Sequence, residues 1–316
     1  MKIRIKNLVI YTGIFFLFAA PSISFDALFP SELKLPDHIK TIAIIDRSIR
    51  EDKLVNILEG GITGEGIGQD RVAARKCLDG LIDLVNNNIH ISFVRTNIEM
   101  TLDSKPGNMA DLLSLAHLKG ICMENEADAV LSLEYFDTDR RGEFIDVKLG
   151  FRIYDLRSNA VIEEYNFSRS GRIHLLENNL VNIINTTYIS NPIMQLSYDA
   201  GRNYGQRISP YWQRVSRIYY KKGRRDKDLA QGARMMEVND WDAAIASFKT
   251  SINSKKRKTQ ARSAHNLAVV YEILSEFETA KEYSQLAWGE YKNKDSKEYS
   301  EILSRRIREV NMLNED

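Results

Sequence analysis

Two similar stretches of helical sequence in the last third of the chain constrain its fold more than any other feature. Apolar residues recur there at helical spacing, and turn-forming residues such as Asn239 and Asp240 separate the helices. Aligning the first pair of helices with the second places Ala244 opposite Ala280, an offset of 36 residues. A repeated hairpin cannot bury its apolar face alone, so we expect the pairs to stack. The five predicted helices span residues 229–238, 241–252, 261–274, 277–291 and 297–312.

Small and aromatic residues recur at matching places in the two pairs, and this pattern resembles the tetratricopeptide repeat, whose period is about 34 residues. The resemblance implies that small residues let the helices approach closely while aromatic residues fill the space between pairs. Residues 297–312 resemble the cap helix of such arrays. A plain helical array without a concave groove is the alternative. The proposed packing residues are Gly232, Trp241, Ala244 and Phe248 in the first pair, and Ala268, Tyr271, Phe277, Ala280 and Ala287 in the second.

The same resemblance implies a binding surface. In tetratricopeptide arrays the first helix of each pair lines the concave face, which contacts peptides or partner domains. The repeat pattern departs from the usual one by an insertion at 255–258 and by Ser251, where alanine is common. These departures affect the angle between the pairs. The residues expected to contact a partner are Asp228, Gln231, Met235, His265, Asn266 and Val269.

The first 24 residues predict a secretory signal peptide. Lys2, Arg4 and Lys6 precede an apolar stretch over residues 8–20, and Ser22 and Ser24 are small residues suited to cleavage near Ser24. An uncleaved membrane anchor is the alternative. The segment ends without a cysteine, so no lipid attachment is expected there, although association with a membrane stays open. We expect an exported protein of the periplasm or the outer-membrane periphery.

Residues 25–40 read as an extended lead-in, and residues 41–220 predict an α/β sandwich with helices covering a mixed sheet. The alternation of apolar and polar residues over 145–153 predicts an antiparallel strand with one face open to water. The charged stretch 221–227 is the expected linker to the all-α repeat domain, 228–316. The predicted strands span 41–46, 89–95, 129–135, 145–153, 161–167 and 211–220, and the predicted helices begin near 69 and span 109–125, 173–187 and 192–207.

The order of elements in 41–167, with the strand TIAIID and the segment NEADAVLSLEYF, resembles an α/β domain of envelope proteins. That domain occurs in the N-terminal part of the Tol-system propeller protein and in lipoproteins of curli secretion and penicillin-binding-protein activation. The whole chain resembles uncharacterised exported Gram-negative proteins in which a domain of unknown function precedes tetratricopeptide repeats. The resemblance implies a scaffolding role in the envelope.

Few residues predict chemistry. A glycine-rich stretch could bind an anion at a helix N-terminus, but it lacks the spacing of a dinucleotide or P-loop motif. A flexible loop is the preferred interpretation. The histidines show no metal-ligand spacing, and we expect no metal and no cofactor. The glycines are Gly60, Gly61, Gly64, Gly66 and Gly68.

The charge balance argues against a nucleic-acid binder, because 44 basic residues face 43 acidic ones. Basic runs at 221–225 and 255–258 either attract an acidic partner or an anionic membrane, or keep loops solvated. Cys77 and Cys122 are expected to be buried thiols, with a disulfide as the alternative.

We therefore expect a non-enzymatic binding or scaffold protein with a protein or peptide partner. The alternatives are a subunit of an outer-membrane assembly that acts through oligomerisation of the α/β domain, and an enzyme that binds an anion or nucleotide at the loop 60–68.

Overall fold

The computed structural model describes residues 21–50, 69–86, 88–102, 109, 111–172, 191–223 and 225–314. It divides into two compact units. Leu28–Trp212 form the first, which we call the α/β unit, and Met1–Ala27 with Gln213–Asp316 form the second, which we call the helical unit. The glycine stretch 60–68, the expected helix 173–187 and the first 20 residues of the expected signal peptide lie outside the described residues.

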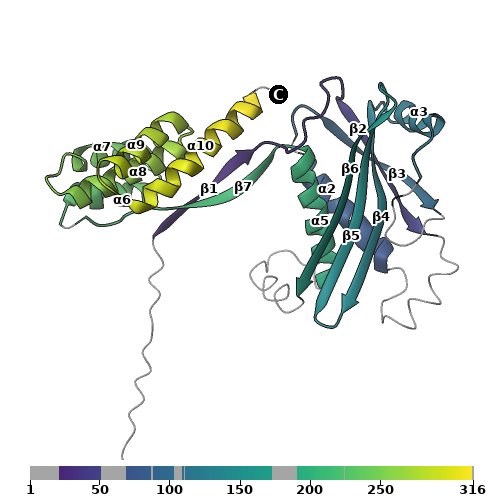
Figure 1. Cartoon of the computed structure of the whole chain (residues 1–316), viewed down its shortest axis with the longest axis horizontal. Helices are drawn as coiled ribbons and strands as arrows, with labels where there is room; N and C mark the ends of the chain where they lie inside the picture. Colours follow the sequence, from purple (N-terminus) through teal and green to yellow (C-terminus); the bar gives the residue numbers. More distant parts are fainter. Residues whose placement is uncertain are drawn as a thin grey trace, which may run out of the picture. The chain divides into compact units, whose positions relative to one another are not determined.

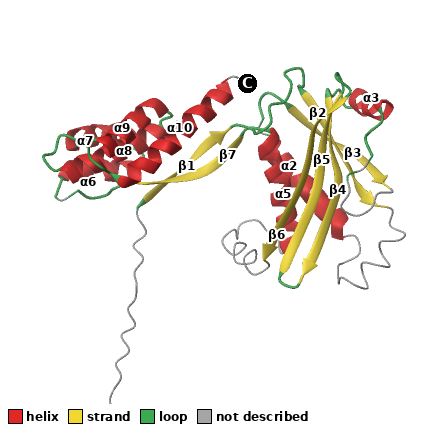
Figure 2. Ribbon diagram, in the orientation of Figure 1, coloured by secondary structure: helices red, strands yellow, loops and turns green. Residues whose placement is uncertain are grey.

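The centre of the α/β unit is a mixed sheet, as predicted, and it has five strands (Figures 1 and 2). The strands lie in the order β3-β2-β4-β5-β6. Strand β2 pairs in parallel with β3 and β4, whereas β5 pairs antiparallel with β4 and β6. The strands are β2 (Thr41–Arg50), β3 (Ser92–Leu102), β4 (Ala129–Arg141), β5 (Phe144–Asp155) and β6 (Ala160–Arg172).

Strand β2 is buried on both faces. Ile42 and Ile44 join a core with helices α2 (Gln69–Val85) and α5 (Pro192–Ile208), while Ala43 and Ile45 join a second core with α3 (Leu115–Glu124). Alternate side chains of a strand point to opposite faces, so the two cores lie on opposite sides of the sheet.

Several boundaries and one exposure differ from the expectation. Strands β2, β3 and β4 continue to Arg50, Leu102 and Arg141 rather than ending near 46, 95 and 135. Strand β3 begins at Ser92 rather than at 89, and α3 begins at Leu115, after the capping hydroxyl of Ser114, rather than at 109. The apolar side chains over 145–153 are buried as expected. The opposite face is open only in the first half of β5, because Arg152 and Tyr154 are buried in the second half.

Helices α2 and α5 cross in close contact at two glycines. A Cβ atom at Gly201 would collide with the carbonyl group of Cys77, and one at Gly80 would collide with the carbonyl group of Tyr198. The pair therefore needs glycine at both positions.

The two cysteines are free and buried. Cys77 lies in the core of α2 and α5, and Cys122 lies in the core of α3 on the other side of the sheet. Burial raises the pKa of the Cys122 thiol to about 11. The expectation of two buried thiols is confirmed, and the disulfide alternative is wrong because the sheet separates the two side chains.

Five helices in sequence make up most of the helical unit (Figure 2). Ala244, Phe248 and Ala280 are completely buried between them, and Trp241 and Phe277 are half-buried. Carboxylates of Asp226 and Asp240 cap the first two helices. The helices are α6 (Lys227–Glu237), α7 (Trp241–Ser251), α8 (Arg257–Ile273), α9 (Phe277–Gly289) and α10 (Lys294–Asn314).

A separate two-stranded sheet pairs β1 (Ser22–Phe29) with β7 (Tyr211–Ile218). The hydroxyls of Ser24 and Ser216 lie 2.7 Å apart across it. The expected lead-in at 25–40 is therefore partly a strand, and 211–220 does not continue the main sheet. Cleavage near Ser24 would remove the first residues of β1. By its internal contacts, the α/β unit spans 28–212.

Candidate functional site

Helix α8 carries three of the six residues expected to contact a partner, and all three are buried. The His265 ring contacts the Ser296 hydroxyl (2.8 Å) and the backbone carbonyl of Ile218 (3.0 Å). Burial lowers the pKa of His265, which favours the neutral ring. The prediction that this face is open to a partner is wrong for His265 and its neighbours, because the chain itself covers it.

Asn266 shows most directly what covers that face. Its side-chain carbonyl accepts a hydrogen bond from the Tyr220 amide (2.8 Å), and its amide group donates to the Tyr220 carbonyl (2.9 Å). The Asn266 side chain thus makes with Tyr220 the two hydrogen bonds that the backbone of a neighbouring strand would make, and so it fixes this part of the chain. Val269 is completely buried in the helical core.

The same segment is also held by a buried ion pair. Arg217 donates two hydrogen bonds to the Glu272 carboxylate, both 2.7 Å, and the Tyr299 hydroxyl donates a third of 2.5 Å. Glu272 is only 2% exposed. Residues 217–220, which we call the clamped segment, therefore contact both α8 and α10. Sequence reasoning missed Glu272, because a lone glutamate in a helix usually faces water.

The remaining three expected contact residues lie on α6. Gln231 is exposed, Asp228 is half-buried, and Met235 packs against the helical core. The structure therefore does not join them with His265, Asn266 and Val269 into one open surface.

A pocket of about 580 Å³ opens beside the clamped segment, and we call it the cationic pocket. Five basic side chains line it, three from the first turns of α8 and two from the loop and the first residue of α10, against one acidic side chain. The basic run 255–258 thus meets basic residues that follow α9 in the sequence. The lining residues are Tyr220, Arg257, Lys258, Ala261, Arg262, Tyr291, Lys292, Asn293, Lys294 and Asp295.

The single acidic group of the cationic pocket already has a partner. The Tyr220 hydroxyl donates a 2.5 Å hydrogen bond to the Asp295 carboxylate, and burial together with Asp295 raises the pKa of Tyr220 to about 12. The Arg262 guanidinium lies 5.0 Å from the centre of the Tyr220 ring and donates to the Lys222 carbonyl. The arginine and the tyrosine are therefore held in place, while Lys258 and Lys294 are exposed.

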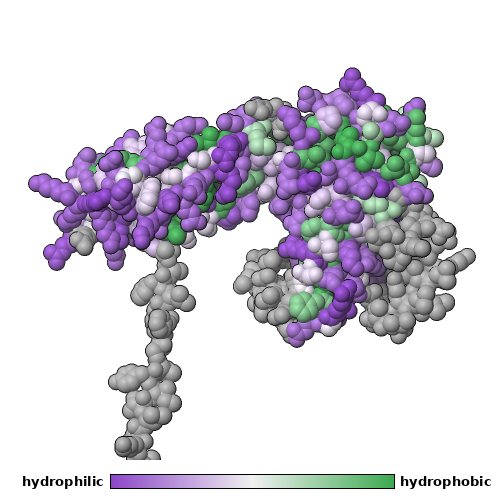
Figure 3. Space-filling view, in the orientation of Figure 1, coloured by the Kyte–Doolittle hydropathy of each residue, from purple (hydrophilic) through white to green (hydrophobic). Residues whose placement is uncertain are grey.

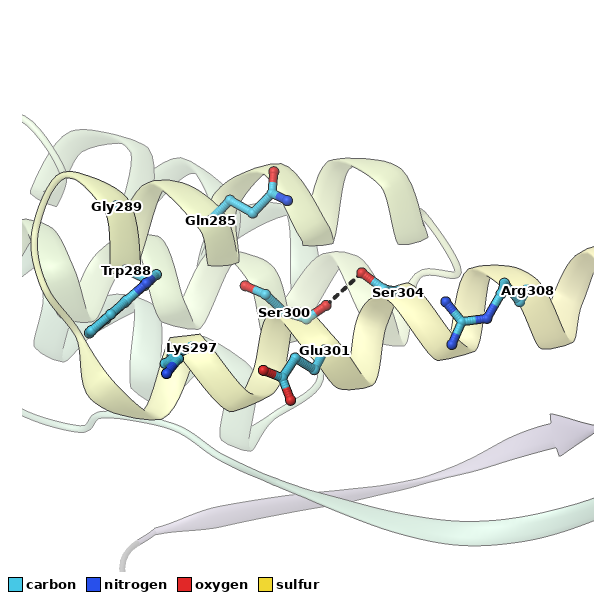
Figure 4. Close-up of a pocket in the computed structure, with 8 residues that line it drawn as sticks. All are labelled: Gln285, Trp288, Gly289, Lys297, Ser300, Glu301, Ser304 and Arg308. Atoms are coloured by element: carbon cyan, nitrogen blue, oxygen red, sulfur yellow. Dashed lines mark hydrogen bonds between the residues drawn. The ribbon is translucent and has the colours of Figure 1, made fainter.

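A groove of about 640 Å³ lies between α9 and α10, and we call it the α9–α10 groove (Figure 4). Trp288 lies at one end, with the Lys292 and Lys297 ammonium groups each 5.8 Å from its ring centre. Lys292 lines the cationic pocket and also contacts the Trp288 ring, so it links the two sites. The groove is lined by Gln285, Trp288, Gly289, Lys297, Ser300, Glu301, Ser304 and Arg308.

The α/β unit contains a buried charge cluster that sequence reasoning missed. Arg47 donates to the Glu134 carboxylate (2.8 Å) and to the Asp111 carbonyl (2.8 Å), and the Tyr154 hydroxyl donates to Glu134 (2.7 Å). Burial raises the pKa of Glu134, and burial together with Glu134 raises that of Tyr154 to about 12. Because Arg47 bonds both to Glu134 and to the Asp111 carbonyl, the cluster anchors the chain ahead of α3. The sequence hinted at this cluster in only two ways: apolar and polar residues alternate along β4, and Arg47 directly follows the apolar strand TIAIID.

Hydrophobic side chains gather on the part of the α/β unit that carries α3 (Figure 3). Leu112 is 61% exposed, Leu115 is 40% exposed and Met123 is 80% exposed. Within the described part of the chain, no group of three histidine, cysteine or carboxylate side chains could hold a metal ion. None of the described helices is both long and apolar enough to cross a bilayer.

Two family models match the chain. The family described as "Domain of unknown function (DUF8603)" matches residues 39–220, and "Domain of unknown function (DUF6340)" matches residues 230–308. No curated protein matches the sequence.

Similar solved structures include a PelC dodecamer from Paraburkholderia phytofirmans, at 13% identity and a TM-score of 0.28, covering 60% of this chain and 99% of that one. The hypothetical protein CT253 from Chlamydia trachomatis has 11% identity and a TM-score of 0.26, with coverages of 52% and 93%. TolB from Acinetobacter baumannii has 10% identity and a TM-score of 0.22, with coverages of 59% and 31%. Scores this low assign no function.

Proposed function

Because this chain belongs to the DUF8603 family of unknown function, we propose from its own geometry that it is a non-enzymatic, exported binding protein of the cell envelope. Its helical unit acts as a tetratricopeptide-like scaffold of two helical pairs, with α10 as the cap. An extended segment of a protein partner binds in the α9–α10 groove. Export is supported by the signal-type pattern of Lys2, Arg4 and Lys6 before an apolar stretch.

The observation that carries the proposal is the contrast between two faces of the helical unit. The face expected to bind a peptide is occupied by the clamped segment, whereas the α9–α10 groove keeps the half-buried ring of Trp288 beside open space. Tryptophan supplies a large, rigid contact area and is enriched at the centres of protein interfaces. The partner segment therefore packs an apolar side chain on Trp288.

Site-specific photo-crosslinking tests this assignment. A photoreactive residue at Gln285 or Arg308 is expected to crosslink one protein of the envelope fraction, and the same residue at the exposed Gln231 of α6 is the control. Trp288→Ala should reduce the yield about tenfold, as expected for loss of a buried aromatic contact. Equal labelling from all three positions, or labelling that is insensitive to Trp288→Ala, would contradict the proposal.

Exposed Leu112, Leu115 and Met123 favour a second candidate function, assembly through the α/β unit. In that case the purified chain forms a defined oligomer, and Met123→Glu dissociates it because a charge cannot be buried there without a partner. Light scattering measures the mass directly. A monomeric native chain at micromolar concentration would exclude this candidate.

A further inference from the structure

We propose that the cationic pocket binds carboxylate side chains of an acidic segment in the partner protein. This inference deepens the proposed function and rests on it, because the acidic segment is taken to continue from the residues that occupy the α9–α10 groove. The observation behind it is the meeting of two basic stretches that lie far apart in the sequence, 255–258 and 292–294, around one concave space.

Charge is the first argument. Five cations surround the space, and the single carboxylate, Asp295, already accepts a hydrogen bond from Tyr220. Among the described residues that line the pocket, positive charges therefore strongly outnumber negative ones, and they surround a concave space. Such a hollow attracts anions more strongly than the same charges spread on a convex surface, because low-dielectric walls focus the field.

The donors are also arranged for oxygen ligands. Arg262 is fixed over the Tyr220 ring, and Arg257 is fixed through its hydrogen bond to the Glu290 carbonyl (2.9 Å). Helix α8 begins at Arg257, so the positive end of its dipole adds to the charge of the side chains. Fixed guanidinium groups beside exposed lysines suit carboxylate oxygens, because both kinds of cation form short hydrogen bonds to them.

The shape and the neighbourhood favour a peptide over a membrane. An extended chain can contact the hollow and the neighbouring groove at once, whereas a single lipid headgroup reaches only the hollow. Lys292 joins the two sites, since its ammonium group contacts Trp288 and lines the pocket. One chain can therefore place an apolar residue on Trp288 and its acidic residues in the pocket.

Fluorescence anisotropy with a labelled glutamate-rich octapeptide tests the inference on the full chain. The glutamine counterpart of the peptide is the neutral control. Lys258→Glu together with Lys294→Glu reverses two exposed charges that line the pocket. A matched double reversal at the exposed Lys119 and Lys227 changes the net charge equally elsewhere.

The pocket variant should lose about tenfold or more in affinity for the glutamate peptide, since each reversal turns a solvent-screened attraction into a repulsion. The control variant should bind like the native chain, and added salt should weaken binding. Equal weakening by both variants, or equal binding of the glutamine peptide, would overturn the site. If phosphatidylglycerol vesicles bind and the glutamate peptide does not, the inference of a peptide ligand is wrong, and the pocket binds lipid headgroups instead.

The result is separable from the test of the proposed function. If only the pocket assignment is wrong, the glutamate peptide does not bind while crosslinking from Gln285 persists. Loss of crosslinking with retained peptide binding shows instead that the groove assignment is wrong.

Discussion

Single residues decide how closely the layers of the α/β unit approach. Gly201 on α5 and Gly80 on α2 allow each helix to touch the backbone of the other, and backbone atoms cannot move aside as a flexible side chain can. A methyl group added at Gly120 on α3 would meet no atom within 4 Å. The same substitution therefore has opposite consequences at the two kinds of position.

We expect Gly201→Ala to lower the free energy of unfolding of the α/β unit by about 3 kcal/mol, because the added methyl group forces α5 away from α2. Gly120→Ala should instead raise it by up to about 1 kcal/mol, since alanine favours an exposed helix. Denaturant titration measures both. Similar values for the two variants would show that the helices do not cross as described.

The buried ring of His265 makes the stability of the helical unit depend on pH. Its pKa is lowered in the folded protein from the ordinary value of 6.5, so the unfolded chain binds the proton more tightly. The stability that the neutral ring contributes is present above about pH 6.5 and is lost as the pH falls below that value. The slope reaches at most about 1.4 kcal/mol per pH unit.

The pH dependence can be isolated by comparing the native chain with His265→Gln. The difference in unfolding free energy between about pH 7.5 and about pH 5.5 should be larger for the native chain, because the other titrating groups are common to both. Parallel pH profiles would contradict a buried neutral ring at this position.

Among the elements, the clamped segment explains why the expected binding face is closed. Asn266 alone satisfies the amide and the carbonyl of Tyr220. Asn266→Ala should cost about 1–3 kcal/mol, since it removes the partner of two partly buried backbone groups, and it should speed hydrogen exchange at the Tyr220 amide. Gln231→Ala on the exposed surface of α6 should change stability by less than about 0.5 kcal/mol. Unchanged exchange at Tyr220 would mean that Asn266 does not hold the segment.

Elements with strong local patterns were predictable, and long-range pairings were not. The strand TIAIID and the helices of the helical unit follow from apolar spacing within about fifteen residues. The pairing of Ser24 with Ser216 has no such local signal. Glu272 and His265 looked like surface residues because their partners, Arg217 and Ile218, come from outside the helices. The run 255–258 indicated one side of the cationic pocket, but Lys292 and Lys294 on the other side follow α9 and showed no link to it in the sequence.

At the scale of the whole molecule, the helical unit is discontinuous in sequence. The chain begins it with β1, forms the entire α/β unit, and returns to it with β7. Its buried carboxylate, Glu272, is paired by Arg217, which precedes the boundary at 221 that composition suggests. The natural limit of the helical unit is therefore at 213.

A fragment covering Gln213–Asp316 should consequently be more stable than one covering 221–316. The shorter piece lacks Arg217 and the rest of the clamped segment, so Glu272, His265 and Asn266 lose their partners and this face of α8 is exposed to water. Thermal unfolding followed by circular dichroism compares the two, and Arg217→Ala in the longer fragment should reproduce much of the loss. Equal melting temperatures would contradict the role given to the clamped segment.

The separation of β1 from β7 sets an order of events during synthesis. The first strand leaves the ribosome long before the second, and at ordinary elongation rates the delay is on the order of ten seconds or more. The whole α/β unit is made in this interval, and β1 has no partner strand until β7 follows. The helices are made last, and their buried polar side chains find partners only when β7 has already arrived. A chain that ends before β7 is made therefore lacks the strand that pairs with β1.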